Sequence, residues 1–529
     1  MSFTVYENAV FHTLDSRSSA VSAIVSSEGR IAFRGSVAEA REFAPQAKRV
    51  DLAGAYAVPG FADSHVHTAQ LALRSAEIDL GSATSASAAV AMVAERVSTL
   101  EPSNSTSWIF GGRWNHRTWD NPALPTLHEL DAVTGSHPTA LHHSDLHTYW
   151  LNTAALAFLG IDGATPDPSG GTIVRDANGA ATGILLEAAG FWAGRLLEDV
   201  TKGDLARLLP GTLQFLVSQG ITSLHDIDGM DAWEAFANLH EAGTLPLRVS
   251  KVAPVSSLET LIEQGVRSGD GDAWLRRGGV KIFSDGSLSS GTCLMHSPYG
   301  ESQSMGLAVT PVEELNNLVL RANGNGLSAA VHAIGDRAVS NALDAFELSA
   351  RKFLQQPVGR NRIEHVQHIA RADVQRLAST GTLACMQPSS CTSDIELVDA
   401  LLAQHDVLSY AWASIVAAGG IVSFSSDAPV EVTNPFFGLY AGITRQRADG
   451  FPAGGWQPEQ ILSRERALHA AATSHTVATG EENLKGTLEV GKLADFVVLD
   501  RDPMTCSPAE LRNTQVKMTV IDGAIRWSE

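Results

Sequence analysis

The sequence predicts an α/β fold: a (β/α)8 barrel of the TIM type, with a composite β-sandwich domain from both chain ends and a large insertion after the first barrel strand. Three observations predict it. Eight short apolar, β-branched runs recur in the middle of the chain, strand-like alternation occurs near both ends, and one long interval separates the first run from the second. Strands that alternate with helices indicate a parallel sheet, and eight of them are the number that such a barrel needs.

The two ends of the chain carry the alternating pattern of short antiparallel strands. It occurs in FTVYENAVFHTL, SAIVSSEGRIAFRG and RVDLAGAYAVPG at the start, and in GTLEVGKLADFVVLD and VKMTVIDGAIRWS at the end. Because chain termini are often close together in space, we expect residues 1–57 and 484–529 to form one β-sandwich domain.

The barrel is expected in residues 58–483. Its eight predicted strands are AVPGFADSHVH, GITSLHDI, LPLRVSKVAPV, GGVKIFSDG, GLSAAVHAIGD, RIEHVQHI, GTLACMQPSS and GGIVSFSSDAP. Between several of them lie amphipathic stretches such as DRAVSNALDAFELSARKFL, which predict helices.

An insertion near residues 70–210 follows the first strand. It carries Trp108, Trp114, Trp119, Trp150 and Trp192, which are half of the 10 tryptophans in the chain. Loops after barrel strands shape the active site, so we expect this segment to lie over it.

Composition excludes several classes of protein. The chain has 38 Lys and Arg residues and 58 Asp and Glu residues, which gives a net charge of −20. Such an acidic protein repels phosphate groups, so nucleic acid is an unsuitable partner. Four cysteines without a Cys-x-x-Cys pair suit a reducing compartment, and neither a signal sequence nor a membrane-spanning run is present, so we expect a cytoplasmic protein. No nucleotide-binding glycine loop and no Gly-x-Ser-x-Gly elbow occur. Its length is typical of enzymes that form homodimers.

His65 and His67 are the first candidate metal ligands. Side chains two apart on a strand project from the same face, so both imidazoles can reach one ion. His-x-His is common by chance, but polar residues also end other predicted strands: Lys281, His332, His365 and Asp427. Each alone has an ordinary structural explanation, such as a helix cap or an ion pair. Their convergence at one end of a barrel predicts a metal site.

Ordered motifs along nearly the whole chain carry a family resemblance. They are PGFADSHVH, GGVKIFSDG, VHAIGDRA, RIEHVQHI, FSSDAPVEVTNPF and the closing GTLEVGKLADFVVLD. The chain thus resembles the amidohydrolase superfamily, specifically its third family, whose metal-dependent hydrolases include N-substituted formamide deformylase.

The resemblance implies a role for each candidate ligand. His65 and His67 would bind the more buried metal ion, and His332 and His365 the more exposed one. Lys281 would bridge the two ions as a carbamate, its N6-carboxylated form. Asp427 would bind a metal and transfer protons. Zinc suits these ligands, although nickel, manganese and iron are also compatible, and an unmodified Lys281 would favour a single ion.

Four further residues are candidate substrate contacts. His368 lies three residues after His365, so the two project from opposite faces of a regular strand, and the family pattern selects His365 as the ligand. His225 ends the second strand, and Trp114 and His147 lie in the insertion. For Trp114, His147 and His225, packing or capping is the alternative interpretation.

These observations predict hydrolysis of a non-peptide C–N bond in a small-molecule substrate, with N-substituted formamides or N-acyl amines as the leading class. Hydrolysis of cyclic amides, aryl esters or lactones, and deamination, use the same chemistry and stay open. A non-catalytic binding or regulatory protein that retains the fold is the alternative from another class.

Overall fold

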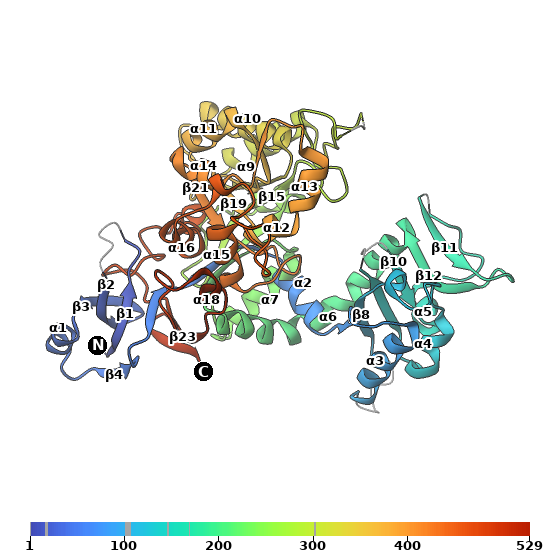
Figure 1. Cartoon of the computed structure of the whole chain (residues 1–529), viewed down its shortest axis with the longest axis horizontal. Coiled ribbons are helices and arrows are strands. Elements are labelled where there is room, and N and C mark those ends of the chain that lie inside the picture. Colours follow the sequence, from blue (N-terminus) through green and yellow to red (C-terminus); the bar gives the residue numbers. More distant parts are fainter. Residues whose placement is uncertain (1, 16–19, 101–106, 145–147, 169, 301–302) are drawn as a thin grey trace. The chain divides into compact units, whose positions relative to one another are not determined.

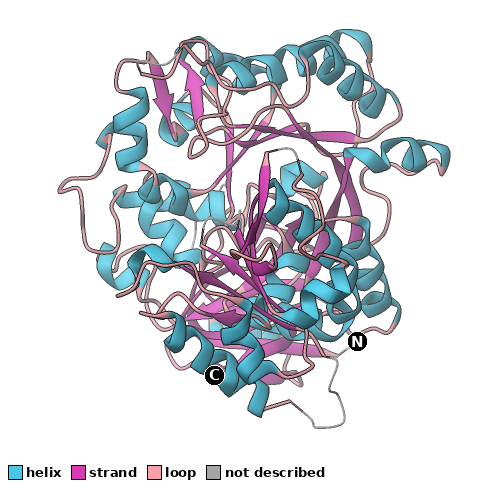
Figure 2. Cartoon of the chain, turned by 90° about the vertical axis from the view of Figure 1, so that its right-hand side faces the viewer, coloured by secondary structure: helices cyan, strands magenta, loops and turns pink. Residues whose placement is uncertain are grey.

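The computed structural model describes residues 2–15, 20–100, 107–144, 148–168, 170–300 and 303–529. The chain divides into two compact units, one formed by residues 1–68 with 210–529 and the other by residues 69–209. Figure 1 labels the elements in chain order, and Figure 2 shows that both helices and strands build the fold. Among the described residues, no helix has the length and apolar character needed to cross a membrane.

The first unit contains the predicted barrel. Its eight parallel strands pair in the order β21-β19-β17-β16-β15-β14-β13-β6. Seven lie within the runs expected from the sequence and β15 begins three residues before its run, so the fold class is confirmed. Their bounds are β6 (Phe61–Val66), β13 (Ile221–Asp226), β14 (Arg248–Pro254), β15 (Leu275–Phe283), β16 (Ser328–Ala333), β17 (Arg362–His365), β19 (Leu383–Met386) and β21 (Ile421–Phe424). All six residues of β13 are buried, as expected for a parallel sheet that is covered on both faces.

Helices follow the barrel strands in the sequence. They are α7 (Met230–Glu241), α8 (Leu258–Glu263), α9 (Val312–Gly324), α10 (Asp336–Lys352), α11 (Arg371–Thr380), α12 (Pro388–Ser393), α13 (Ile395–Leu402), α14 (Trp412–Ala417), α15 (Pro435–Thr444) and α16 (Arg464–Ala472). Helix α10 is the amphipathic stretch noted in the sequence, and it buries Val339, Leu343 and Phe346 on one face.

The barrel closes between β6 and the residues that follow β21. The backbone N–H of Asp427 donates to the carbonyl of His65 at 2.8 Å, and the N–H of His67 donates to the carbonyl of Ala428 at 2.8 Å. The hydroxyls of Ser64 and Ser423, one residue earlier on β6 and within β21, lie 2.5 Å apart. Closure therefore places three of the predicted ligands side by side, although Asp427 is about 360 residues from the two histidines.

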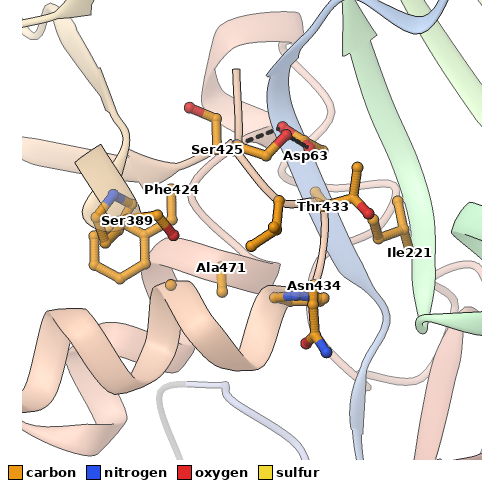
Figure 3. Close-up of a pocket in the computed structure, with 14 residues that line it drawn as sticks. Asp63, Ile221, Ser389, Phe424, Ser425, Thr433, Asn434 and Ala471 are labelled. Carbon is orange, nitrogen blue, oxygen red and sulfur yellow. Dashed lines mark hydrogen bonds between the residues drawn. The ribbon is translucent and has the colours of Figure 1, made fainter. Parts of the chain in front are cut away.

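Asp63 links the end of β6 to the residues that follow β21. Its carboxylate accepts the backbone N–H of Ser426 at 3.0 Å and that of His65 at 3.3 Å. Burial raises the pKa of Asp63 to about 6, although these hydrogen bonds oppose the shift. Figure 3 shows this carboxylate at the edge of a small cavity of about 30 Å³ beside Thr433. Asp63 thus fixes the ends of two strands rather than facing the site described below.

Strands from both ends of the chain form one sheet. Its order is β24-β23-β22-β5-β1-β2-β3, with β4 paired to β1. The strands are β1 (Phe3–His12), β2 (Ala20–Ser27), β3 (Arg30–Gly35), β4 (Lys48–Asp51), β5 (Tyr56–Pro59), β22 (Phe496–Leu499), β23 (Val516–Ile521) and β24 (Ala524–Ser528). The antiparallel pairing of β22 with β5 joins the two ends, and Tyr6, Phe11 and Phe496 pack together beneath it.

The second unit has a sheet and a core of its own. The sheet order is β11-β12-β10-β9-β8-β7, with β7 (Ile78–Asp79), β8 (Ile109–Trp114), β9 (Thr139–His143), β10 (Thr148–Leu151), β11 (Gly171–Arg175) and β12 (Ala181–Glu187). The unit also contains α3 (Ala86–Ser98), α4 (Leu127–Thr134) and α5 (Thr153–Leu159). Helices α2 (Thr68–Ser75) and α6 (Ala188–Ser218) span its limits. The sequence predicts an insertion here, but not its sheet.

A buried ion pair ties a barrel strand to the C-terminal part of the chain. Arg248 of β14 donates from Nε and Nη2 to the carboxylate of Asp495 at 2.6 and 2.9 Å, and both side chains are buried. We expect Arg248→Met to lower the free energy of unfolding by about 3–5 kcal/mol, because Asp495 would become an unpaired buried charge. The urea midpoint measures this. Arg321→Met, which breaks the exposed pair with Glu259, is the control, and an equal shift in both variants would contradict the expectation.

Candidate metal centre

All six predicted metal ligands line one cavity at the carboxyl ends of the barrel strands. The cavity has a volume of about 330 Å³, and its lining includes His65, His67, Lys281, His332, His365 and Asp427. The residues come from β6 and the position directly after it, from β15, β16 and β17, and from the loop that follows β21. The structure therefore brings together residues that are spread over most of the sequence.

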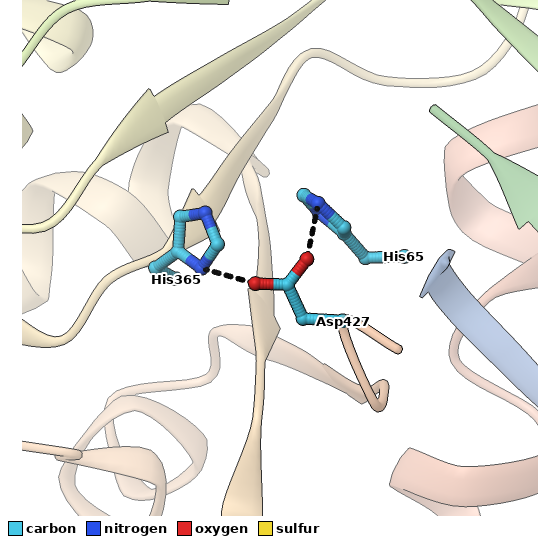
Figure 4. Close-up of side chains that lie close together, drawn as sticks. All are labelled: His65, His365 and Asp427. Atoms are coloured by element: carbon cyan, nitrogen blue, oxygen red, sulfur yellow. Dashed lines mark ion pairs between the residues drawn. The ribbon is translucent and has the colours of Figure 1, made fainter. Parts of the chain in front are cut away.

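Asp427 lies at the centre of the cluster. Its Oδ1 atom is 3.2 Å from Nε2 of His65 and 3.5 Å from Nε2 of His67, and its Oδ2 atom is 4.0 Å from Nδ1 of His365. Figure 4 shows His65 and His365 on either side of this carboxylate. Lys281 completes the cluster, with Nζ 3.4 Å from Nε2 of His65.

Carboxylates orient the first two histidines. Nδ1 of His65 lies 2.5 Å from Oε2 of Glu364, and Nδ1 of His67 lies 3.0 Å from Oδ1 of Asp228. Each Nδ1 therefore carries the proton that it donates, and each Nε2 faces Asp427. This is the arrangement in which a carboxylate fixes the tautomer of a metal-binding histidine. Sequence reasoning did not identify Glu364 or Asp228.

His332 and His365 form the other side of the cluster. Their ring centroids are 4.6 Å apart. Nδ1 of His365 lies 2.9 Å from Oε1 of Gln387, and Nε2 of His332 lies 3.2 Å from the carbonyl of Gly286. Burial lowers the pKa of His365 to about 4 and that of His332 well below its ordinary value. Both rings are therefore neutral at pH 7, as metal ligation requires.

Asp285 supports the part of the site that carries His332. Its carboxylate accepts backbone N–H groups of Leu294, Ile334 and Gly335 at 2.8–3.1 Å, and Oδ1 lies 3.5 Å from Nε2 of His332. It therefore fixes the loop after β16, the strand that carries His332.

Charge interactions set the protonation of the remaining ligands. Burial opposes the ionisation of Asp427, but the neighbouring imidazoles outweigh it and hold the pKa of Asp427 well below its usual range. Burial lowers the pKa of His67, while Asp228 and Asp427 raise it more, to about 9. A metal ion must therefore displace a proton from His67 when it binds. Burial lowers the pKa of Lys281 to about 8, so a fraction of its amine is neutral at pH 7.

Two ligands lie in strained backbone. The φ angles are +78° at His365 and +58° at Asp427, in the left-handed region that residues other than glycine seldom adopt. Such conformations cost about 1–3 kcal/mol each and concentrate at functional sites. The surrounding hydrogen bonds of the barrel mouth must therefore impose them.

The donor set fits a divalent metal ion. Nitrogen and oxygen atoms of His65, His365 and Asp427 lie within 4.8 Å of one another, and imidazole with carboxylate is a ligand set typical of zinc and similar ions. A second group, His65 with Glu364 and Cys385, is equally close. It fits less well, because Glu364 already pairs with Arg362 at 2.5 Å and burial raises the pKa of the Cys385 thiol well above its usual value.

The wall of the cavity carries two more carboxylates, which sequence reasoning missed. Asp394 accepts the hydroxyl of Tyr410 at 2.5 Å, and Glu431 accepts that of Ser393 at 3.0 Å. Burial raises the pKa of both. Within the described part of the chain, neither forms an ion pair with a lysine or arginine. Glu431 lies in the quoted motif FSSDAPVEVTNPF, which was the available signal.

Three of the four expected substrate contacts, His225, His368 and Trp114, are not in the lining of this cavity. His225 and His368 are buried elsewhere in the first unit, where Nδ1 of His225 accepts from Arg362 at 2.7 Å and Nδ1 of His368 lies 2.9 Å from the hydroxyl of Ser409, between β18 (His368–Ala370) and β20 (Val407–Ser409). Trp114 is fully buried in the core of residues 69–209, and its indole N–H donates to the carbonyl of Leu141. All three side chains are buried, in packing or in hydrogen-bond networks. His147 lies outside the described residues.

Known proteins are similar to this chain in sequence and in fold. YtcJ of Bacillus subtilis (strain 168), which carries the name of an amidohydrolase, is 28% identical over 99% of each chain. The N-substituted formamide deformylase of Arthrobacter pascens is 29% identical over 98% of this chain and 97% of its own. A crystal structure of an uncharacterised metal-dependent hydrolase from Pyrococcus furiosus superposes with a TM-score of 0.79 at 26% identity, over 95% of this chain and 100% of the other.

The family match covers most of the chain. Residues 48–526 match the amidohydrolase family. The range contains every barrel strand and all six residues of the cluster. The chain therefore belongs to the amidohydrolase family, as a metal-dependent hydrolase that acts on carbon–nitrogen bonds.

Proposed function

We propose that the enzyme hydrolyses a non-peptide amide, with N-substituted formamides and N-acyl amines as its substrate class. The observation that carries the proposal is the cluster of four imidazoles, one lysine and one carboxylate in a single cavity of about 330 Å³. A cavity of this size suits a small molecule. The relative from Arthrobacter pascens, a formamide deformylase that matches almost end to end, supports the substrate class.

The residues present would hold one or two zinc ions. His65 and His67 would hold the first and His332 and His365 the second, with Asp427 as a further ligand. Lys281 would act as a bridge after its amine reacts with carbon dioxide, because a carbamate offers two anionic oxygens while an ammonium offers no lone pair. The low pKa of Lys281, about 8, supports this step, since only the neutral amine reacts. An unmodified Lys281 favours one ion.

Asp427 would move the proton of the reaction. A bound divalent ion supplies Lewis acidity, which makes water more acidic and polarises a carbonyl group. Asp427 is ionised at neutral pH, so it can accept the proton that the attacking water loses. It would then deliver that proton to the departing nitrogen. The transfer is needed because an amine leaves readily only when it is protonated.

The cavity wall adds an expectation about the substrate. Phe283, Leu288 and Val430 offer apolar surface, while Asp394 and Glu431 add negative charge. A cationic group on the substrate would offset that charge, whereas an anionic group would be repelled.

A hydrolysis panel with the zinc-loaded enzyme tests the proposal. We expect N-substituted formamides and N-acyl amines to react faster than lactams, lactones and aryl esters. Among acetamides, we expect the 4-aminobutyl compound to react faster than its uncharged butyl analogue. The assay follows amine release. Faster reaction of lactams or esters, or release of ammonia from an amino-substituted ring, would replace the proposed substrate class by one of those alternatives.

Metal content separates the enzyme from a non-catalytic regulatory protein. A similar protein from Pectobacterium carotovorum, 29% identical over 71% of this chain, is named as an exoenzymes regulatory protein. A regulatory function is therefore the second candidate to test. Less than about half an equivalent of transition metal after purification, together with no hydrolysis after reconstitution, would support the regulatory function.

A further inference from the structure

A continuous polar network runs from the metal cluster into the interior of the barrel. Oε2 of Glu364 lies 2.5 Å from Nδ1 of His65, and Oε1 lies 2.5 Å from Nε of Arg362. Nη1 of Arg362 donates to Nδ1 of His225 at 2.7 Å. These four side chains are each at most 3% exposed, so solvent cannot replace any of the contacts.

Strand geometry fixes the central pair of this network. Arg362 and Glu364 are two residues apart in β17, so their side chains project from the same face. Their opposite charges lie side by side in the buried interior, where an unpaired charge is strongly unfavourable. Arg362 therefore keeps the carboxylate of Glu364 in place, and Glu364 keeps the His65 ring in place.

The far end of the network defines a small polar site. Because Nδ1 of His225 accepts from Arg362, the ring proton of a neutral His225 is on Nε2. Nε2 of His225, Nη2 of Arg362 and Oγ of Ser250 are buried without a hydrogen-bond partner among the described residues. All three residues line a cavity of about 10 Å³. One water molecule fits such a space and would accept from both N–H groups while donating to the hydroxyl.

We propose that Glu364 and Arg362 are positioning residues of the metal centre, and that one ordered water in the cavity beside His225 completes the hydrogen bonds of Arg362, His225 and Ser250. Glu364 holds the proton on Nδ1 of His65 and thereby directs Nε2 at the metal. Arg362 acts one step further away, through Glu364. The proposal rests on the metal-dependent function and concerns how strongly the ion is held, rather than which bond is cleaved.

Zinc affinity tests the positioning role without any substrate. We expect Glu364→Gln to weaken zinc binding by a factor of about 10–100, measured by competition with a chromophoric chelator. The absorption bands of the cobalt-loaded variant should also shift, because the imidazole of His65 changes orientation. Glu259→Gln, which breaks the exposed ion pair with Arg321, is the matched control and should leave both readouts unchanged.

A double variant tests the same role if Glu364→Gln does not fold. Glu364→Gln leaves Arg362 unpaired, whereas the double variant Arg362→Met/Glu364→Gln removes both charges and should fold. It should still bind zinc more weakly than the wild type. Zinc affinity within twofold of the wild type in both variants, with unchanged cobalt spectra, would overturn the positioning role even if the enzyme hydrolyses amides. A high-resolution crystal structure with an empty cavity beside His225 would overturn the water site.

Discussion

Replacing Asp427 with asparagine should lower kcat for amide hydrolysis by a factor of about 10²–10⁴. Asparagine keeps the size of the side chain but has no carboxylate to accept a proton from water. In the wild type, the imidazoles of His65 and His67 lie 3.2 and 3.5 Å from Oδ1 and hold the pKa of Asp427 well below its usual range. The carboxylate is thus ionised throughout the neutral range, and the amide of asparagine cannot replace it.

Zinc content and a pH profile separate the two roles of Asp427. If the variant holds as much zinc as the wild type and turns over slowly, the loss lies in proton transfer; if it loses zinc, the carboxylate acts chiefly as a ligand. Asp406→Asn, which changes an exposed carboxylate paired with Arg371, should retain full activity. A wild-type kcat and pH profile in Asp427→Asn would remove this residue from the mechanism.

The regular features of the barrel were predictable because they depend on short-range periodicity. Side chains alternate along a strand, so His65 and His67 had to share a face, and both do reach Asp427. The same alternation explains why Glu364 escaped notice. In a regular strand, successive side chains point to opposite faces, so if Glu364 points inward then His365 points outward. In the structure both side chains point inward, because the φ angle of +78° at His365 interrupts the regular alternation of the strand.

Other features depend on contacts that a single sequence does not contain. His225 ends β13 as expected, but its partner Arg362 is 137 residues away, and only the closed barrel makes it part of a buried network. Trp114 looked suited to line a pocket, yet it packs against Trp119 and Trp150 in a core that belongs to residues 69–209 alone. Tryptophan serves both purposes equally well, so the composition of this segment did not distinguish them.

Lys281→Ala should abolish measurable hydrolysis, the largest effect expected at this site apart from loss of the metal itself. The amine of Lys281 lies 3.4 Å from Nε2 of His65, a place where a cationic ammonium would repel a divalent ion. As a carbamate, the same side chain would supply anionic oxygens to both ions. Enzyme prepared without carbon dioxide should lose activity and regain it on addition of bicarbonate, and native mass spectrometry should detect the added carbon dioxide.

Chemical rescue distinguishes the carbamate from a purely structural lysine. Alanine leaves space in the cavity, so short-chain carboxylic acids should partly restore the activity of Lys281→Ala by placing a carboxylate where the carbamate lay. Lys492→Ala, which removes an amine paired with Glu489 at 2.8 Å outside the cavity, should need no rescue. Full activity of Lys281→Ala without any additive would show that the lysine only packs, and a centre with one ion would then follow. Rescue by carboxylates but not by amines favours two ions, because only an anionic bridge can hold a pair of divalent cations side by side.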